Sequence, residues 1–179
     1  MPFPLPPVPV LLSRQVPPAS PADGRHAFDF FEGRWLVHNR RLTKILVGST
    51  TWRSFDAYQE CRLLLGGMAN VDEMRTVEGE PVGVSLRAFD HAKGTWSIWW
   101  VTRGGVLEPP VEGTFRGGVG TFTGKDTYES RPIEVKFTWS KITHTSAQWE
   151  QAFSEDGGRT WETNWVMTFE RLDAQAPRP

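Results

Sequence analysis

The sequence predicts an all-β protein: an up-and-down antiparallel barrel of about ten strands with one short helical segment near its N-terminus. The chain of 179 residues holds 9 Trp, 11 Phe and 17 Gly, and aromatic residues together with glycine are typical of strands joined by tight turns. Apolar and polar residues alternate with a period of two along several segments, as in strands with one buried face. An open meander of that length would expose two strand edges, and closure into a barrel removes both.

Length, charge and cysteine content exclude several other classes. The chain suits one domain, and 39% apolar residues are enough for a sizeable core. The net charge is −1, which argues against a nucleic-acid partner, and no run of about 18 apolar residues predicts a membrane-spanning helix. The single cysteine, Cys61, excludes an internal disulfide framework and a zinc site built from cysteines. We expect a cytoplasmic protein with no nucleic-acid or membrane partner.

The barrel domain is predicted to span residues 26–172, between two tails. Residues 1–25 contain 8 of the 14 prolines, which remove backbone donors, so we interpret them as a disordered, partly polyproline-II tail. A cleaved signal peptide fits poorly, because no positive charge precedes the apolar run Val8–Leu12 and a proline interrupts that run. A ligand for a proline-recognition module is a further alternative. Residues 173–179 are interpreted as a short polar tail.

Within the domain, one helical turn is expected at His26–Glu32, and ten strand-like segments follow with turns rich in Gly, Asp or Pro between them. The expected strands are Arg34–Leu42, Thr51–Arg62, Ala69–Val77, Val82–Asp90, Thr95–Arg103, Val111–Phe115, Val119–Thr123, Pro132–Ser140, Ser146–Ser154 and Trp161–Arg171.

Matched apolar faces predict the hairpins in the second half of the chain. Trp139 is expected opposite Ala147 and Phe137 opposite Trp149, which brings the apolar faces of two strands together. The following turn, Ser154–Trp161, has the S-x-D-x-G-x-T-W pattern of an Asp-box, a motif that caps β-hairpins and indicates little about function.

The Asp-box predicts Phe153 opposite Trp161 and therefore Trp149 opposite Trp165. On this phase the inward residues are Trp100, Phe137, Trp149 and Trp165, and the outward residues are Glu134, Lys136, Glu150 and Asn164. Across the turn Asp90–Gly94, the expected inner face combines Val84, Leu86 and Ala88 with Trp96, Ile98 and Trp100.

The first three strands have no cleanly apolar side. Either polar residues face the interior there, or this wall of the barrel is partly uncovered, and buried polar groups need partners. Two interpretations of inward polar residues stay open: an internal network of ion pairs and hydrogen bonds, or a ligand site. The phase of all three strands is also open, and on the opposite phase of the first strand His38 and Arg40 replace Asn39 and Arg41.

The segment Phe31-Glu32-Gly33-Arg34-Trp35 resembles the G-x-W motif that opens the first strand of lipocalin-like, or calycin, barrels. The resemblance implies that Trp35 closes one barrel end beside an arginine of a late strand, for which Arg171 is the candidate. Longer stretches are similar to a bacterial family of calycin-like (lipocalin and fatty-acid-binding-protein-like) domains, and no catalytic residue carries over from it. These stretches are Phe28–Trp35, Leu65–Glu73, Ala147–Phe153 and Asn164–Trp165.

Two functional classes follow from a barrel with an aromatic wall and a polar wall. The first is a binding protein for a small apolar or amphipathic molecule, whose acidic or hydrogen-bonding head group meets Arg41, unless Asp72 neutralises that arginine. The second is a small enzyme that transfers protons in the same cavity, of the isomerase or cyclase kind, using Arg41, Asp72 or His38. The expected ligand-binding residues are Trp35, Asn39, Arg41, Asn70, Asp72, Trp100, Phe137, Trp149, Gln151 and Trp165.

Other chemistries find little support in the sequence. The four histidines have no metal-ligand spacing, no G-x-S-x-G nucleophile elbow is present, and Cys61 fits a packed residue. Gly118–Lys125 lacks the spacing and the Ser or Thr of a phosphate loop. We expect no metal and no cofactor. A second alternative is haem binding, as in the ten-stranded nitrobindins, although no sequence motif singles out His144 or another residue as the axial ligand. Assembly into a homodimer is also left open.

Overall fold

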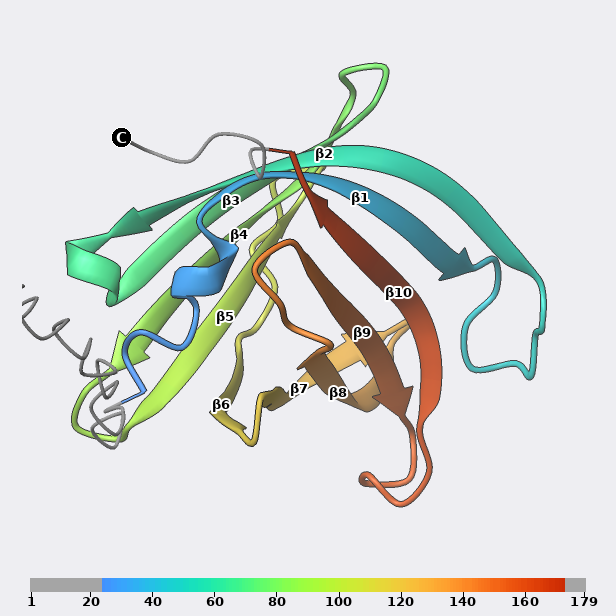
Figure 1. Cartoon of the computed structure of the whole chain (residues 1–179). Helices are drawn as coiled ribbons and strands as arrows, with labels where there is room; N and C mark the ends of the chain where they lie inside the picture. Colours follow the sequence, from blue (N-terminus) through green and yellow to red (C-terminus); the bar gives the residue numbers. More distant parts are fainter. Residues whose placement is uncertain (1–23, 173–179) are drawn as a thin grey trace, which may run out of the picture.

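The chain forms a closed barrel of ten antiparallel strands in a computed structural model that describes residues 24–172 (Figure 1). Each strand pairs with its neighbours in sequence, and β1 closes the barrel against β10. The strands are β1 (Gly33–Leu42), β2 (Trp52–Leu64), β3 (Ala69–Thr76), β4 (Pro81–Asp90), β5 (Thr95–Thr102), β6 (Val111–Arg116), β7 (Val119–Tyr128), β8 (Arg131–Ser140), β9 (Ser146–Ser154) and β10 (Glu162–Arg171). The all-β, calycin-like barrel predicted from the sequence is therefore confirmed.

The expected strands agree with the observed ones, with small differences at their ends. The largest difference is in β7, which continues to Tyr128 although the sequence pattern ends it at Thr123. The expected helical turn contains the 3-10 helix η1 (Asp29–Phe31), and a second one, η2 (Leu65–Gly67), joins β2 to β3. The predicted tails 1–25 and 173–179 lie outside the described residues, apart from Gly24 and Arg25. No helix within residues 24–172 is long and apolar enough to cross a membrane.

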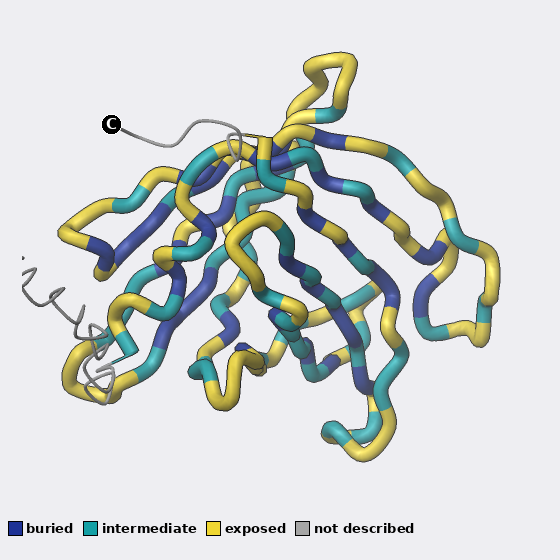
Figure 2. Tube along the Cα trace, viewed as in Figure 1, coloured by how far each residue is buried: buried dark blue, intermediate teal, exposed yellow. Residues whose placement is uncertain are grey.

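The inward phase of β1, β2 and β3 is settled by their burial pattern, in which buried and more exposed residues alternate along the strands (Figure 2). Asn39 and not His38 faces inward, together with Gln59, Asn70 and Asp72, all at most 3% exposed. Polar groups therefore occupy the interior of this wall, one of the two arrangements that the sequence leaves open.

Two predicted registers are wrong. In the β8–β9 hairpin Trp139 pairs with Trp149 and Phe137 with Gln151, a shift of two residues that leaves the inward faces unchanged. After the Asp-box, Glu162 pairs with Phe153, and a β-bulge follows between Thr163 and Trp165. The bulge adds one residue to β10, so Asn164 is fully buried instead of facing outward as predicted.

The predicted inner face of β4 is also wrong. Four residues separate the paired Asp90 and Thr95, and Gly94 adopts a positive φ of 67° in that turn. With four residues in the turn, each odd-numbered residue of β4 pairs with an even-numbered residue of β5. Arg87 therefore lies opposite Ile98. Val84, Leu86 and Ala88 therefore lie on the outer face, Leu86 40% exposed, and Ser85 and Arg87 face inward.

An aromatic plug closes one end of the barrel. In Figure 1 the short blue turn η1 lies across this end, and it brings Phe28 and Phe31 into the interior, both fully buried. Phe31 stacks on Trp35 of β1 at 5.5 Å between ring centroids and contacts Trp139 of β8 at 4.8 Å. Dense ring packing of this kind leaves no space for a ligand.

Arg171 secures the plug from β10, as the resemblance to calycin barrels implies. Its guanidinium carbon lies 4.2 Å from the centroid of the Trp35 ring. The same group donates hydrogen bonds to the backbone carbonyls of Phe30, Glu32 and His144. The last strand is thereby tied to the segment that precedes the first.

Candidate functional site

The other end of the barrel opens into a cavity of about 420 Å³. The connections β1–β2, β3–β4, β5–β6, β7–β8 and β9–β10 all lie at this end, and residues of β1–β2 and β5–β6 line the cavity. The β5–β6 connection folds back on β5 through a hydrogen bond from the Glu108 amide to the Trp100 carbonyl, 2.8 Å long. That bond holds the backbone of Glu108 against β5, and Glu108 lines the cavity.

A continuous aromatic wall lines one side of the cavity. Phe137 contacts Trp149 at 4.8 Å, Trp149 contacts Trp165 at 5.6 Å, and Trp165 contacts Trp100 at 6.2 Å, measured between ring centroids. All three contacts are edge-on, the geometry that aromatic pairs prefer. The rings come from β8, β9, β10 and β5, and all four line the cavity.

Two buried amide side chains, Asn39 and Gln151, accompany this wall. Asn39 accepts a hydrogen bond of 3.0 Å from the indole nitrogen of Trp165 and donates to the Val37 carbonyl. Gln151 lines the cavity and donates to the Asn164 side chain at 2.8 Å, which uses the residue that the bulge turns inward. Asn39 is therefore a positioning residue, and it does not line the cavity.

Charged groups surround the mouth. The guanidinium carbon of Arg41 lies 4.6 Å from the centroid of the Trp165 ring, at the point where the aromatic wall meets solvent. Partial burial lowers the pKa of Arg41, and Glu108 opposes that shift. Burial, followed by the nearby Asp126, raises the pKa of Glu108, while Arg41 lowers it. The mouth therefore combines a permanent cation with a carboxyl that holds its proton more tightly than usual.

A buried ion pair forms the inner end of the cavity, next to the plug. Arg87, 3% exposed, bonds through Nη1 to a carboxylate oxygen of Asp72 and to Oδ1 of Asn70, the second bond being 2.9 Å long. The other oxygen of Asp72 accepts a hydrogen bond from Gln59. Arg87 and Gln59 line the cavity, whereas Asp72 and Asn70 lie behind them.

The structure brings six of the ten predicted site residues together around the cavity. These are Arg41, Trp100, Phe137, Trp149, Gln151 and Trp165. The other four lie elsewhere: Trp35 in the plug, Asn39 behind Trp165, and Asn70 and Asp72 behind Arg87. The expected alternative in which Asp72 neutralises Arg41 is not the observed pairing, because Asp72 pairs with Arg87.

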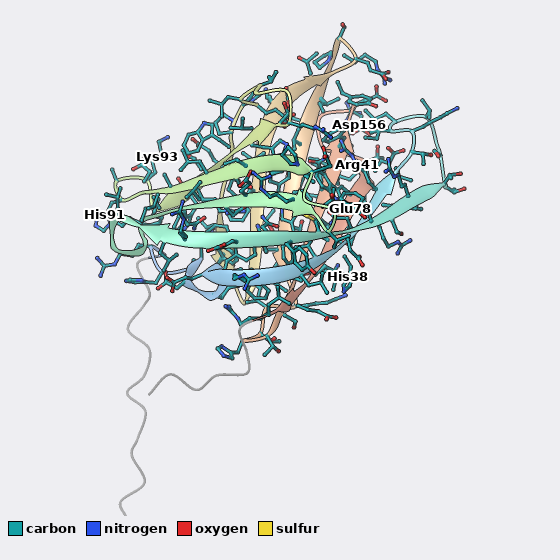
Figure 3. All side chains as sticks on the ribbon, turned by 90° about the horizontal axis from the view of Figure 1, so that it is seen from above. His38, Arg41, Glu78, His91, Lys93 and Asp156 are labelled. Carbon is teal, nitrogen blue, oxygen red and sulfur yellow. The ribbon has the colours of Figure 1, made fainter. Side chains whose placement is uncertain are left out.

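The histidines lie away from the cavity, which none of those in residues 24–172 lines. His38 projects from the outer face of β1 and bonds to Asp56 at 2.8 Å, while Arg41 of the same strand lies at the mouth (Figure 3). His144, exposed in the β8–β9 connection, lies toward the plug end, where its carbonyl binds Arg171. No group of three His, Cys, Asp or Glu within the described part of the chain could hold a metal ion.

Cys61 is a packed residue of the barrel interior. Burial raises the pKa of the Cys61 thiol to about 12, so it stays protonated and unreactive at neutral pH.

The Asp-box stabilises the turn between β9 and β10. Asp156 accepts hydrogen bonds from the backbone and hydroxyl of Thr160, from the hydroxyl of Ser154 and from the backbone of Arg159. These bonds, those of Thr160 first, lower the pKa of Asp156 far below its ordinary value.

Comparison with known proteins agrees on the fold. The barrel is similar to the S-type phycobiliprotein lyase CPES from Guillardia theta, with a TM-score of 0.54 and 11% identity over 80% of this chain and 89% of that one. It also aligns with Rv2717c from M. tuberculosis, with a TM-score of 0.48 and 13% identity over 81% and 96% of the two chains. No family model and no curated protein matches the sequence. At 11% identity, the likeness to the lyase shows a shared barrel fold and nothing finer.

Proposed function

We propose that this protein binds a small apolar or amphipathic molecule inside the barrel. The observation that carries the proposal is the cavity itself: about 420 Å³, open at one end and walled by four aromatic rings. Sites for small ligands have volumes of roughly 300–1,000 Å³, mostly apolar linings and a few placed polar groups. The likeness to a phycobiliprotein lyase supports the barrel as a scaffold for such a cavity, and the substrate of that lyase is not carried over.

Arg41 gives the mouth a preference among amphipathic ligands. Of the charged groups there, Arg103 pairs with Glu80 at 2.7 Å and Lys125 lies 3.9 Å from Glu134, so both cations have partners outside the cavity. Arg41 instead stacks over Trp165 and forms no ion pair within residues 24–172. A ligand whose apolar body rests on the aromatic wall would place an anionic group beside this guanidinium.

The proposal is tested by titrating the full-length protein with the anionic dye 1-anilinonaphthalene-8-sulfonate and competing the dye with fatty acids and aromatic acids. We expect one saturable site per chain. Ser85 lines the cavity, so Ser85→Leu should reduce the affinity by about tenfold or more because it fills space that the dye needs. The matched control is Ser54→Leu on the outer face of β2, which should leave the affinity unchanged.

A second pair of variants tests the head group. Arg41→Ala should weaken binding of carboxylates by about tenfold, since a charge-assisted hydrogen bond is lost. Arg40→Ala is the control, because that arginine projects outward over Trp52, 5.2 Å from its ring centroid. Binding that is insensitive to Ser85→Leu, or the absence of any saturable ligand, would refute the proposed function.

A further inference from the structure

Three buried polar atoms have no hydrogen-bond partner within residues 24–172 and belong to residues that line the inner end of the cavity. They are Nε of Arg87, Nε1 of Trp139 and Oε1 of Gln59. Their residues are at most 3% exposed, and all three line the cavity. A buried donor or acceptor left without a partner costs about 1–3 kcal/mol, so an unfilled set of three points to a group that completes it.

The three atoms belong to one compact cluster. Gln59 and Arg87 bind the two different oxygens of the Asp72 carboxylate, and the guanidinium carbon of Arg87 lies 5.7 Å from the centroid of the Trp139 ring. The same guanidinium lies 5.1 Å from the ring of Phe31, which belongs to the plug. The cluster is therefore the floor of the cavity, with solid aromatic packing beneath it.

The charge of this floor differs from that of the mouth. Asp72 neutralises Arg87, so the floor holds two unused N–H donors and one unused carbonyl acceptor but no net charge. A carboxylate placed there would lie close to the Asp72 carboxylate and would have to compete with it for Arg87. A neutral group that both accepts and donates hydrogen bonds meets no such penalty.

We propose that the floor is a second subsite, which binds a neutral hydrogen-bonding group, an amide or a hydroxyl, at the leading end of the ligand. This inference rests on the proposed function and deepens it. Arg87 Nε and Trp139 Nε1 donate to the oxygen of that group, and Gln59 Oε1 accepts from its N–H or O–H. The ligand then has two different ends: a neutral polar group inside and an anionic or solvated group at Arg41.

Three naphthalene probes of nearly equal shape separate these possibilities: 2-naphthamide, 2-isopropenylnaphthalene and 2-naphthoate. Each competes with the anilinonaphthalene dye for the full-length protein. We expect the amide to bind about fivefold or more tightly than the hydrocarbon, because it fills donors that are otherwise unpaired. If enclosed water already satisfies the three atoms, the amide gains nothing over the hydrocarbon, and that result would overturn the subsite.

Trp139→Phe removes one unpaired donor and keeps an aromatic ring in place. It should weaken the amide by about fivefold and leave the hydrocarbon nearly unchanged. Trp149→Phe is the matched control, the same chemical change in the aromatic wall, and it should affect both probes alike. Equal losses for both probes in Trp139→Phe contradict the proposed donor role.

The indole N–H resonance of Trp139, identified by its loss in Trp139→Phe, gives a readout that does not depend on affinity. In ¹⁵N-labelled wild-type protein it should move downfield with the amide and stay in place with the hydrocarbon. If Trp139→Phe does not fold, the affinities of the amide and the hydrocarbon for the wild-type protein still decide. Dye that binds but is not displaced by the amide overturns the subsite alone, whereas dye that does not bind refutes the cavity function as well.

Discussion

The two ends of the barrel use the same kinds of residue and differ in what lies between them. At the plug end, the 3-10 helix η1 inserts Phe28 and Phe31 among Trp35, Trp139 and Phe169, and all five rings are almost completely buried. At the open end, Trp100, Phe137, Trp149 and Trp165 line a cavity, since no segment within residues 24–172 enters it. Whether an aromatic stripe on a strand becomes packed core or the wall of a cavity thus depends on a segment elsewhere in the chain.

The polar residues divide in the same way. Near the plug, Arg87 and Asp72 neutralise each other away from water. At the mouth, Arg41 and Glu108 remain partly solvated and influence each other only through space. Substitutions should therefore cost stability at the plug end and change binding at the open end.

The largest expected effect on the free energy of unfolding comes from replacing one phenylalanine at each end of the barrel. Phe31→Ala should lower the free energy of unfolding by about 4 kcal/mol, because a fully buried ring leaves a cavity. Phe137→Ala should lower it by about 2 kcal/mol, because that ring already borders empty space. Urea denaturation measures both, with Lys136→Glu, a partly exposed neighbour on the outer face, as a control expected within about 0.5–1 kcal/mol. Equal losses for the two phenylalanines would erase the distinction between plug and wall.

The buried ion pair gives the next effect. Asp72→Asn should destabilise the protein by about 3 kcal/mol, because Arg87 becomes an uncompensated charge in the interior. Glu73→Gln, on the adjacent residue, removes the partner of an exposed Arg75 and should cost about 0.5 kcal/mol or less. Similar midpoints in urea for the two variants would show that the interior pair is better solvated than its burial indicates.

Gly83 allows a further test of the aromatic wall at the open end. A Cβ on Gly83 would lie 2.1 Å from the Trp100 ring, so Gly83→Ala forces that ring of the aromatic wall to move. We expect a loss of about 2 kcal/mol together with weaker dye binding. Gly104→Ala is the control for the free energy of unfolding, since the nearest atom to its Cβ would be 3.7 Å away. Unaltered dye binding in Gly83→Ala would show that Trp100 is not part of the wall that a ligand meets.

The smallest effect is a pH dependence at the mouth. Since the pKa of Glu108 is raised, the native state binds this proton more tightly than the unfolded chain, and the resulting contribution to stability is lost as pH rises above about 4.5. Protonation also removes a negative charge beside Arg41, so 2-naphthalenesulfonate, which stays anionic throughout this pH range, should bind about threefold more tightly as pH falls through the raised pKa. Glu108→Gln should remove this part of the pH profile and leave 2-naphthamide unaffected, and a profile identical to wild type would assign the titration to another group.

Sequence patterns predicted the strands well because alternation and turn residues act locally. The aromatic wall followed from the same alternation, and an error of two residues in the β8–β9 register did no harm because the side-chain period is two. The polar residues of β1 and β3 were named as candidates, but alternation alone left their phase open, and only the burial pattern shows that Asn39, Asn70 and Asp72 face inward. The ligand role of Asn70 and Asp72 stays a prediction.

The sequence analysis did not identify Arg87, which faces inward and pairs with Asp72. Its inward position depends on whether the turn after Asp90 has an odd or an even number of residues, and one residue reverses every side chain of β4. The left-handed Gly94 and the capping of the Ala92 and Lys93 amides by Asp90 were the local signals of a four-residue turn. The bulge at Asn164 had no such signal, because it depends on pairing with Gln151 in another strand.

Closure of the barrel has a consequence for the order of folding. Nine of the ten strand pairings join neighbours in sequence, from β1–β2 to β9–β10. The tenth, the seam between β1 and β10, waits for Arg171, which lies 139 residues beyond the Glu32 carbonyl that it binds. Loop-closure entropy makes such a distant pairing slow, and until it forms β1 presents a free edge to other chains. Pulsed hydrogen exchange during refolding should therefore find the seam amides protected last, which makes a nascent chain most prone to aggregation just before Arg171 arrives.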